Sequence, residues 1–296
     1  MKKMSMKKIA FAAAVTLALS ASTQAGPVVI GGDDLNDHGS WDGTDNLAGW
    51  LYIQNALAGL IAQVTLSGND GTIVVLGSDP SSVPGTTSSD GCAAAHFPAQ
   101  ALTPARTVAC IEGDVAIAAY LSGVASGTNR PAVIVHPGNG VGNDVDAAEE
   151  AAWAAGATTV ANYVAAGGGL LAHEGDFTWL TALLPGIVVA PGVCVAAPGA
   201  TLTTAGGTAF PTLTDADINA GPCHASFSGD FGGLQVLAND ASVPPLPFIL
   251  GGGGGTTFEG TPMIVPTLNP WMLALLAAFL GLVARHRLVR QRTNSN

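Results

Sequence analysis

The stretch AAEEAAWAAGATTVANYVAAGGGLLAHEG, residues 147–175, decides which class of fold the chain adopts. Residues 147–166 are rich in alanine, a strong helix former, and three consecutive glycines at 167–169 stop the helix. The apolar residues 170–172 that follow are typical of a short buried strand. A helix, a glycine stop and a buried strand in this order indicate one unit of an α/β fold.

The same alternation continues on both sides of this stretch. Because short buried strands separated by helices form parallel sheets covered on both faces, the chain predicts a doubly wound, mostly parallel sheet of the flavodoxin type. The predicted strands cover residues 27–30, 72–76, 132–135, 170–172, 187–190, 234–237 and 247–250. The predicted helices cover residues 46–64, 115–124, 147–166, 178–184 and 215–219, and residues 77–91 are expected to form a loop.

Charge is divided sharply along the chain. All 21 acidic residues lie between Asp33 and Glu259, where only Arg106 and Arg130 offset them, so this middle part carries a formal charge of −19. A surface this negative repels phosphate, which excludes nucleic acid as a partner. The hydrophobic fraction of 48% argues against a disordered chain, which needs low hydrophobicity.

Residues 1–25 have the pattern of a secretory signal peptide. Lysines precede an apolar run at 9–19, and Thr23 and Ala25 occupy the small-residue positions of a cleavage site. The apolar run is too short to span a bilayer. We therefore expect export by the Sec-type machinery and a secreted α/β domain over residues 26–250.

The tail has a different composition from the middle of the chain. Residues 251–264 are expected to form a glycine-rich linker. The apolar run at 271–284 begins with a tryptophan suited to the membrane interface and is followed by arginines typical of the cytoplasmic side. This pattern predicts one C-terminal transmembrane helix.

The tail also holds the most specific motif in the chain. It runs Val265-Pro266-Thr267-Leu268, then Trp271, then a Leu/Ala-rich segment and terminal arginines. This motif, over residues 265–292, resembles the IPTL-CTERM protein-sorting domain of Gram-negative bacteria, a relative of the PEP-CTERM signals. The resemblance implies a sortase-like processing enzyme as a partner. It also implies tethering to the inner membrane facing the periplasm, with transfer to the cell surface as the alternative.

The middle of the chain resembles a second family as a pattern. The first strand ends in Gly31-Gly32-Asp33-Asp34, and the segments GGGLLAHEG at 167–175 and WLTALLPG at 179–186 follow later. Together they resemble the class I glutamine amidotransferase-like fold. That family carries a nucleophilic cysteine in the turn where this chain has His173 and Glu174. The resemblance therefore implies the fold without amidotransferase chemistry by this route.

Polar side chains follow several of the predicted strands at their carboxyl ends. Asp33 and Asp34 follow the first strand, His136 the third, and His173 and Glu174 the fourth. Ligands of such sheets bind beyond these ends, and imidazole with carboxylate suits a divalent metal whose bound water could hydrolyse a substrate. Exposed strand-end loops are also polar without any ligand. The five residues are therefore either metal ligands or cap and turn residues.

The four cysteines of an exported chain indicate disulfides. Four cysteines allow three pairings. We favour Cys92 with Cys110 and Cys194 with Cys223, because each pair closes a loop region between strands.

Two functions remain open at this point. The leading hypothesis is an exported, membrane-tethered or sorted cell-surface protein whose α/β domain is a non-catalytic binding or structural module. The alternative is a divalent-metal-dependent hydrolase at the strand ends. Ser226, His224 and Asp230 lie close together in sequence, but in a polar loop this spacing is near chance and predicts no catalytic triad.

Overall fold

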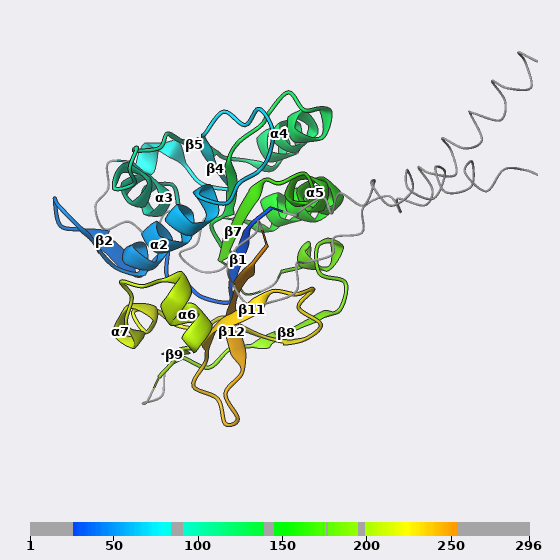
Figure 1. Ribbon diagram of the computed structural model, residues 1–296. Helices are drawn as coiled ribbons and strands as arrows, with labels where there is room; N and C mark the ends of the chain where they lie inside the picture. Colours follow the sequence, from blue (N-terminus) through cyan, green and yellow to red (C-terminus); the bar gives the residue numbers. More distant parts are fainter. Residues whose placement is uncertain are drawn as a thin grey trace, which may run out of the picture. The chain divides into compact units, whose positions relative to one another are not determined.

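A mixed sheet of eight strands forms the centre of the computed structural model (Figure 1). The structure describes residues 26–83, 91–138, 145–173, 175, 177–194 and 199–253. In spatial order the strands are β5 (Val108–Ile111), β4 (Ile73–Leu76), β6 (Val133–His136), β7 (Gly169–His173), β1 (Val28–Gly31), β12 (Pro247–Gly252), β11 (Gln235–Asn239) and β9 (Thr201–Leu202).

The direction of the strands changes within this sheet. The pairs from β5 to β1 are all parallel, whereas β12, β11 and β9 pair antiparallel. Two small antiparallel sheets accompany it: β2 (Gly39–Trp41) with β3 (Asn46–Ala48), and β8 (Ile187–Pro191) with β10 (Ala225–Gly229).

Helices cover both faces of the parallel half. They are α2 (Gly49–Ile61), α3 (Gly91–Gln100), α4 (Asp114–Ser126) and α5 (Ala147–Ala165). Two shorter helices, α6 (Thr204–Ala209) and α7 (Asp215–Ile218), lie beside the antiparallel strands, and short 3-10 turns form at Pro80–Ser82 and Leu180–Ala182. Figure 1 shows α2 and α3 on one side of β4 and β7, and α4 and α5 on the other. Each face therefore has its own apolar core.

Successive side chains of each strand point to opposite faces of the sheet, so each strand contributes residues to both cores. Val75 and Leu171 pack into the core beneath α2, whereas Ile134 and Leu170 pack into the core beneath α5. Strands β1, β4, β6 and β7 are buried along their whole length, as expected for parallel strands with helices on both faces.

Local sequence explains why α5 begins and ends where it does. Asp146 accepts hydrogen bonds from the amides of Ala148 and Glu149, while the Glu149 carboxylate accepts from the Asp146 amide, which makes a capping box. After the helix, Gly167 has a φ of 102°, a conformation that only glycine adopts without strain. The glycine stop therefore ends the helix and turns the chain into β7.

The prediction of a doubly wound, mostly parallel sheet with a C-terminal transmembrane helix is wrong. The sheet is mixed because β12 follows β11 through the loop 240–246 and runs antiparallel to β1, and an apolar run does not reveal strand direction. No helix in the described part of the chain has the length and apolarity needed to cross a membrane. The expected helix at 271–284 lies outside the described residues, as do residues 1–25 and the motif at 265–292.

Most predicted elements are confirmed within three residues at each end, the helix predicted at 178–184 is only a 3-10 turn at Leu180–Ala182, and several elements were missed. Residues 46–48 form a strand where the helix was expected to begin, and the last strand extends to Gly252, two residues into the expected linker. The missed elements are α3, β2, β5, β9, β10 and α6. The strand predicted at 187–190 exists as β8, but it pairs with β10 outside the main sheet.

Candidate functional site

Two adjacent parallel strands bring Asp33 and His173 together at the carboxyl edge of the sheet. Gly31, at the end of β1, is in register with His173, at the end of β7. His173 Nδ1 lies 2.8 Å from Asp33 Oδ1, and both side chains are only 1% exposed. The same carboxylate oxygen accepts a hydrogen bond from the Leu35 amide at 3.1 Å. With Asp33 ionised, the Nδ1–H of His173 donates to it, which leaves Nε2 as the free ring nitrogen.

Helix α2 contributes a third buried group, Tyr52. Its ring packs edge-on against His173, with ring centroids 5.7 Å apart, and edge-on against Phe210 at 5.4 Å. Burial raises the pKa of Tyr52 well above its ordinary value, and the negative charge of Asp33 and the close approach of its carboxylate to the phenol raise it further. We call Asp33, Tyr52 and His173 the Asp33–His173 centre.

Several polar atoms of this centre are buried without a partner. Asp33 Oδ2, Tyr52 OH and His173 Nε2 have no hydrogen-bond partner among the described residues, and neither does Oδ1 of the next residue in the chain, Asp34. Buried polar atoms are almost always paired in proteins, and an unpaired one costs about 1–3 kcal/mol. Three such atoms in one centre are therefore typical of a place where a ligand or ordered water completes the hydrogen bonding.

The lack of a side chain on Gly31 leaves room for the Asp33 carboxylate beside Tyr52. A Cβ placed on Gly31 would lie 3.2 Å from the Tyr52 hydroxyl and closer still to the Asp33 carboxylate. Any side chain at position 31 would therefore displace the carboxylate. This close approach explains why β1 ends in glycine at the centre.

Asp34 links the centre to the surface through two histidines. Its Oδ2 lies 3.3 Å from His38 Nε2 and 3.2 Å from His224 Nε2, and both histidines are about two-fifths exposed. The hydrogen bond that His224 donates to Asp34 raises the pKa of His224 above its ordinary value, although partial burial opposes the shift. The carboxylate therefore favours a protonated His224.

His136 lies on the other face of the sheet. Its Nε2 is 3.2 Å from Glu150 Oε2, and its ring packs against Trp153 at 4.5 Å and Trp179 at 5.6 Å. His136 is in register with Ala172, one residue before His173. Because successive side chains of a strand point to opposite faces, the two histidines separate.

The five predicted metal ligands therefore do not converge on one site. Asp33 and His173 lie together, Asp34 faces His38 and His224 instead, His136 lies apart beside Glu150, and Glu174 is outside the described residues. Within the described ranges, no group of three or more histidine, cysteine or carboxylate side chains could hold a metal ion.

The Ser226 neighbourhood does not form a triad. Ser226 donates its hydroxyl hydrogen to the buried Asp240, and His224 faces Asp34 instead. Asp230 accepts a hydrogen bond from the Gly232 amide in its own turn. Ser226 and Asp230 make local contacts, and His224 contacts a distant part of the chain.

Both favoured disulfides are present. Cys92 and Cys110 join α3 to β5 with their Cα atoms 5.9 Å apart, and Cys194 and Cys223 have Cα atoms 4.9 Å apart. The second pair also positions part of the site, because Cys223 forms a β-bridge with Asp33 and the His224 amide donates to Gly32 O at 2.7 Å. This disulfide therefore holds His224 beside Asp34.

Sequence reasoning missed Tyr52 and the contact of His224 with Asp34. A phenol in the first turn of an apolar helix, placed just after a run of strand-end carboxylates, was the available signal for Tyr52. His224 belongs to the site only through its contact with Asp34, which is nearly two hundred residues away in the sequence, and no local pattern indicates that contact.

Comparisons with protein families, with curated proteins and with solved structures find no match to this chain.

Proposed function

We propose that this chain is an exported protein whose α/β domain binds a small polar ligand at the Asp33–His173 centre. The observation that carries the proposal is the set of buried, unpartnered polar atoms on Asp33, Tyr52 and His173. They lie where open α/β sheets bind their ligands, beyond the carboxyl ends of the parallel strands.

The chemistry of the centre selects the ligand. Asp33 Oδ2 and Asp34 Oδ1 are free to accept hydrogen bonds from a ligand. His173 Nε2 is also an acceptor when the ring proton is on Nδ1, where it is hydrogen-bonded to Asp33. Two carboxylates in a domain of charge −19 repel an anion. The ligand that fits is neutral or cationic and rich in hydrogen-bond donors, such as an amino alcohol.

A second candidate function is proton transfer to or from the bound ligand. The hydrogen bond from His173 to Asp33 favours it, because a carboxylate that orients an imidazole in one tautomer leaves the other ring nitrogen as a base. In this role His173 would accept a proton from the ligand while Asp33 stabilises the imidazolium. No metal is needed for this step.

The test is titration of the purified chain with ethanolamine, which carries one ammonium and one hydroxyl donor. We expect the ring ¹⁵N resonances of His173 to shift with saturation, and calorimetry to give the same dissociation constant. Asp33→Asn and Tyr52→Phe should each weaken binding. His96→Gln is the matched control, because His96 contacts Phe97 and lies outside the centre.

Two results would reject the binding proposal. One is His173 resonances that stay unchanged while the protein remains folded. The other is equal binding by the Asp33→Asn and His96→Gln variants.

Export is a separate part of the proposal. Two disulfides support an oxidising compartment, and residues 1–25 carry the signal-peptide pattern. We expect the mature protein to begin at Gly26, and an N-terminus still at Met1 in intact-mass measurement would refute this. The motif at 265–292 is proposed as a sorting signal read by a sortase-like enzyme. We propose that this enzyme removes the signal, and a C-terminus at Asn296 in cell-surface protein would contradict that removal.

A further inference from the structure

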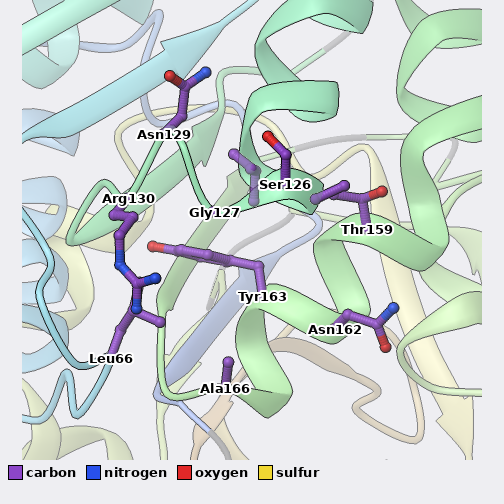
Figure 2. Close-up of a pocket in the computed structure, with 11 residues that line it drawn as sticks. Leu66, Ser126, Gly127, Asn129, Arg130, Thr159, Asn162, Tyr163 and Ala166 are labelled. Carbon is purple, nitrogen blue, oxygen red and sulfur yellow. The ribbon is translucent and has the colours of Figure 1, made fainter.

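A second concave site lies at the opposite edge of the sheet, between the last turns of α4 and α5. Its volume is about 340 Å³, and it is lined by Leu66, by the end of α4, by the turn that leads into β6 and by the last turns of α5. Figure 2 shows Thr159 and Asn162 on one side of Tyr163, and Asn129 and Arg130 on the other. Neither the Asp33–His173 centre nor any predicted site residue contributes to it. We call it the α4–α5 pocket.

The pocket combines an apolar floor with polar groups at its rim. Leu66, Val124 and the Tyr163 ring supply apolar contact, and the Tyr163 hydroxyl is already used, since it donates to Ala132 O at 2.8 Å. At the rim, Thr159 and Asn162 form no side-chain hydrogen bond with any described residue. An apolar base with a few uncommitted polar groups is the usual composition of a small-molecule site.

Arg130 is the most unusual residue of the pocket. It is one of only two basic residues between Asp33 and Glu259, and it forms no ion pair within the described part of the chain. One terminal nitrogen donates to Ser67 O, while Nε is buried without a partner. The guanidinium therefore still has unused donors beside the pocket.

The charges around the pocket disfavour an anionic ligand. Helices α4 and α5 both end here, and each C-terminus carries a partial negative charge. Asp70 is close as well, because its amide donates to Arg130 O at 2.9 Å. These charges offset the single positive charge of Arg130, so the pocket as a whole is not positive.

We propose that the α4–α5 pocket binds one neutral sugar unit. A hydroxyl group both donates and accepts hydrogen bonds, and it therefore suits a rim that offers donors on Arg130 and both donors and acceptors on Thr159 and Asn162. The planar guanidinium can bond two neighbouring hydroxyls, and the C–H face of a sugar ring packs on the apolar floor. A carboxylate could use only the donors and would face the negative helix ends.

The test is calorimetric titration of the purified chain with four neutral sugars: glucose, galactose, mannose and N-acetylglucosamine. Glucuronate serves as the anionic comparison. We expect at least one neutral sugar to bind, and to bind more tightly than glucuronate. Arg130→Gln should weaken that binding by about tenfold, the equivalent of one lost charge-assisted hydrogen bond. Arg106→Gln is the matched control, because Arg106 is the other arginine between Asp33 and Glu259 and lies outside the pocket.

Further variants keep the test decisive if Arg130→Gln fails to fold. Ala166→Phe fills the pocket from an exposed position and should abolish sugar binding. Asp33→Asn should leave sugar binding unchanged, which separates this inference from the function proposed for the other edge. The inference is overturned if no neutral sugar binds, if glucuronate binds more tightly than all four, or if Ala166→Phe has no effect.

Discussion

Replacing Tyr52 by phenylalanine should stabilise the protein while it impairs the Asp33–His173 centre. Phenylalanine keeps the edge-on ring contacts with His173 and Phe210 and removes only the hydroxyl. That hydroxyl is buried and has no hydrogen-bond partner among the described residues. An unpaired buried hydroxyl costs about 1–3 kcal/mol, so removing it is favourable, but the small void that it leaves is unfavourable. We therefore expect a net gain of about 1 kcal/mol in the free energy of unfolding.

The measurement is thermal and urea unfolding with both disulfides intact. For a domain of this size, 1 kcal/mol corresponds to a rise in Tm of about 2–4 °C. Tyr163→Phe is the matched control, because the Tyr163 hydroxyl donates to Pro131 O at 3.1 Å and to Ala132 O at 2.8 Å. Removing that hydroxyl leaves a bond unmade and should cost about 1 kcal/mol.

The sign of the Tyr52 effect decides between two interpretations. A stabilised Tyr52→Phe variant supports a centre in which stability is sacrificed for ligand binding, as is common at functional sites. A loss of 1 kcal/mol or more would show that the hydroxyl bonds to Asp33 in solution as part of the core. That result would refute the argument from unpaired polar atoms.

Three further predictions follow from the described contacts. Because the pKa of His224 is higher in the folded protein than its ordinary value of 6.5, protonated His224 stabilises the folded state below pH 6.5, and this stabilisation should disappear as the pH rises through the folded-state pKa. The free energy of unfolding measured from about pH 5 to pH 9 should show this decrease in the unmodified protein and lack it in His224→Gln. Replacing Cys92 and Cys110 by serine removes a disulfide that spans 18 residues and should lower the free energy of unfolding in urea by about 3 kcal/mol. An unchanged free energy would show that this disulfide is absent in solution. Gly167→Ala should lower stability by at least about 1–2 kcal/mol, because its φ is 102° and the new Cβ would lie 2.8 Å from the Leu66 amide nitrogen; an unchanged Tm would contradict this.

The sequence predicts this fold best where the strands are buried on both faces. A continuous apolar run such as the one in β4 is stable only where both faces of the strand are buried. Helix α5 has strong start and stop signals in its sequence. The weaker elements were missed for physical reasons. Helix α3 contains Pro98 and no clear apolar stripe, and β10 is recognisable only through its pairing with β8.

The site shows the same division. Strand-end position identified Asp33 and His173, because the carboxyl ends of adjacent parallel strands lie side by side. It could not place His136 correctly, since the face on which a strand-end side chain lies depends on its register with the neighbouring strands. Tyr52 and His224 come from elements far apart in sequence, and only chain packing brings them to the two aspartates.

The sequence alone therefore determined the alternation of buried strands and helices, the acidic charge and the favoured cysteine pairs. All of these depend on local composition and spacing. The tertiary structure decided which strands run antiparallel, which histidine meets Asp33, and that a pocket forms between the ends of α4 and α5. These features depend on contacts between segments distant in the chain, and the free energy of such contacts is set by packing rather than by any local pattern.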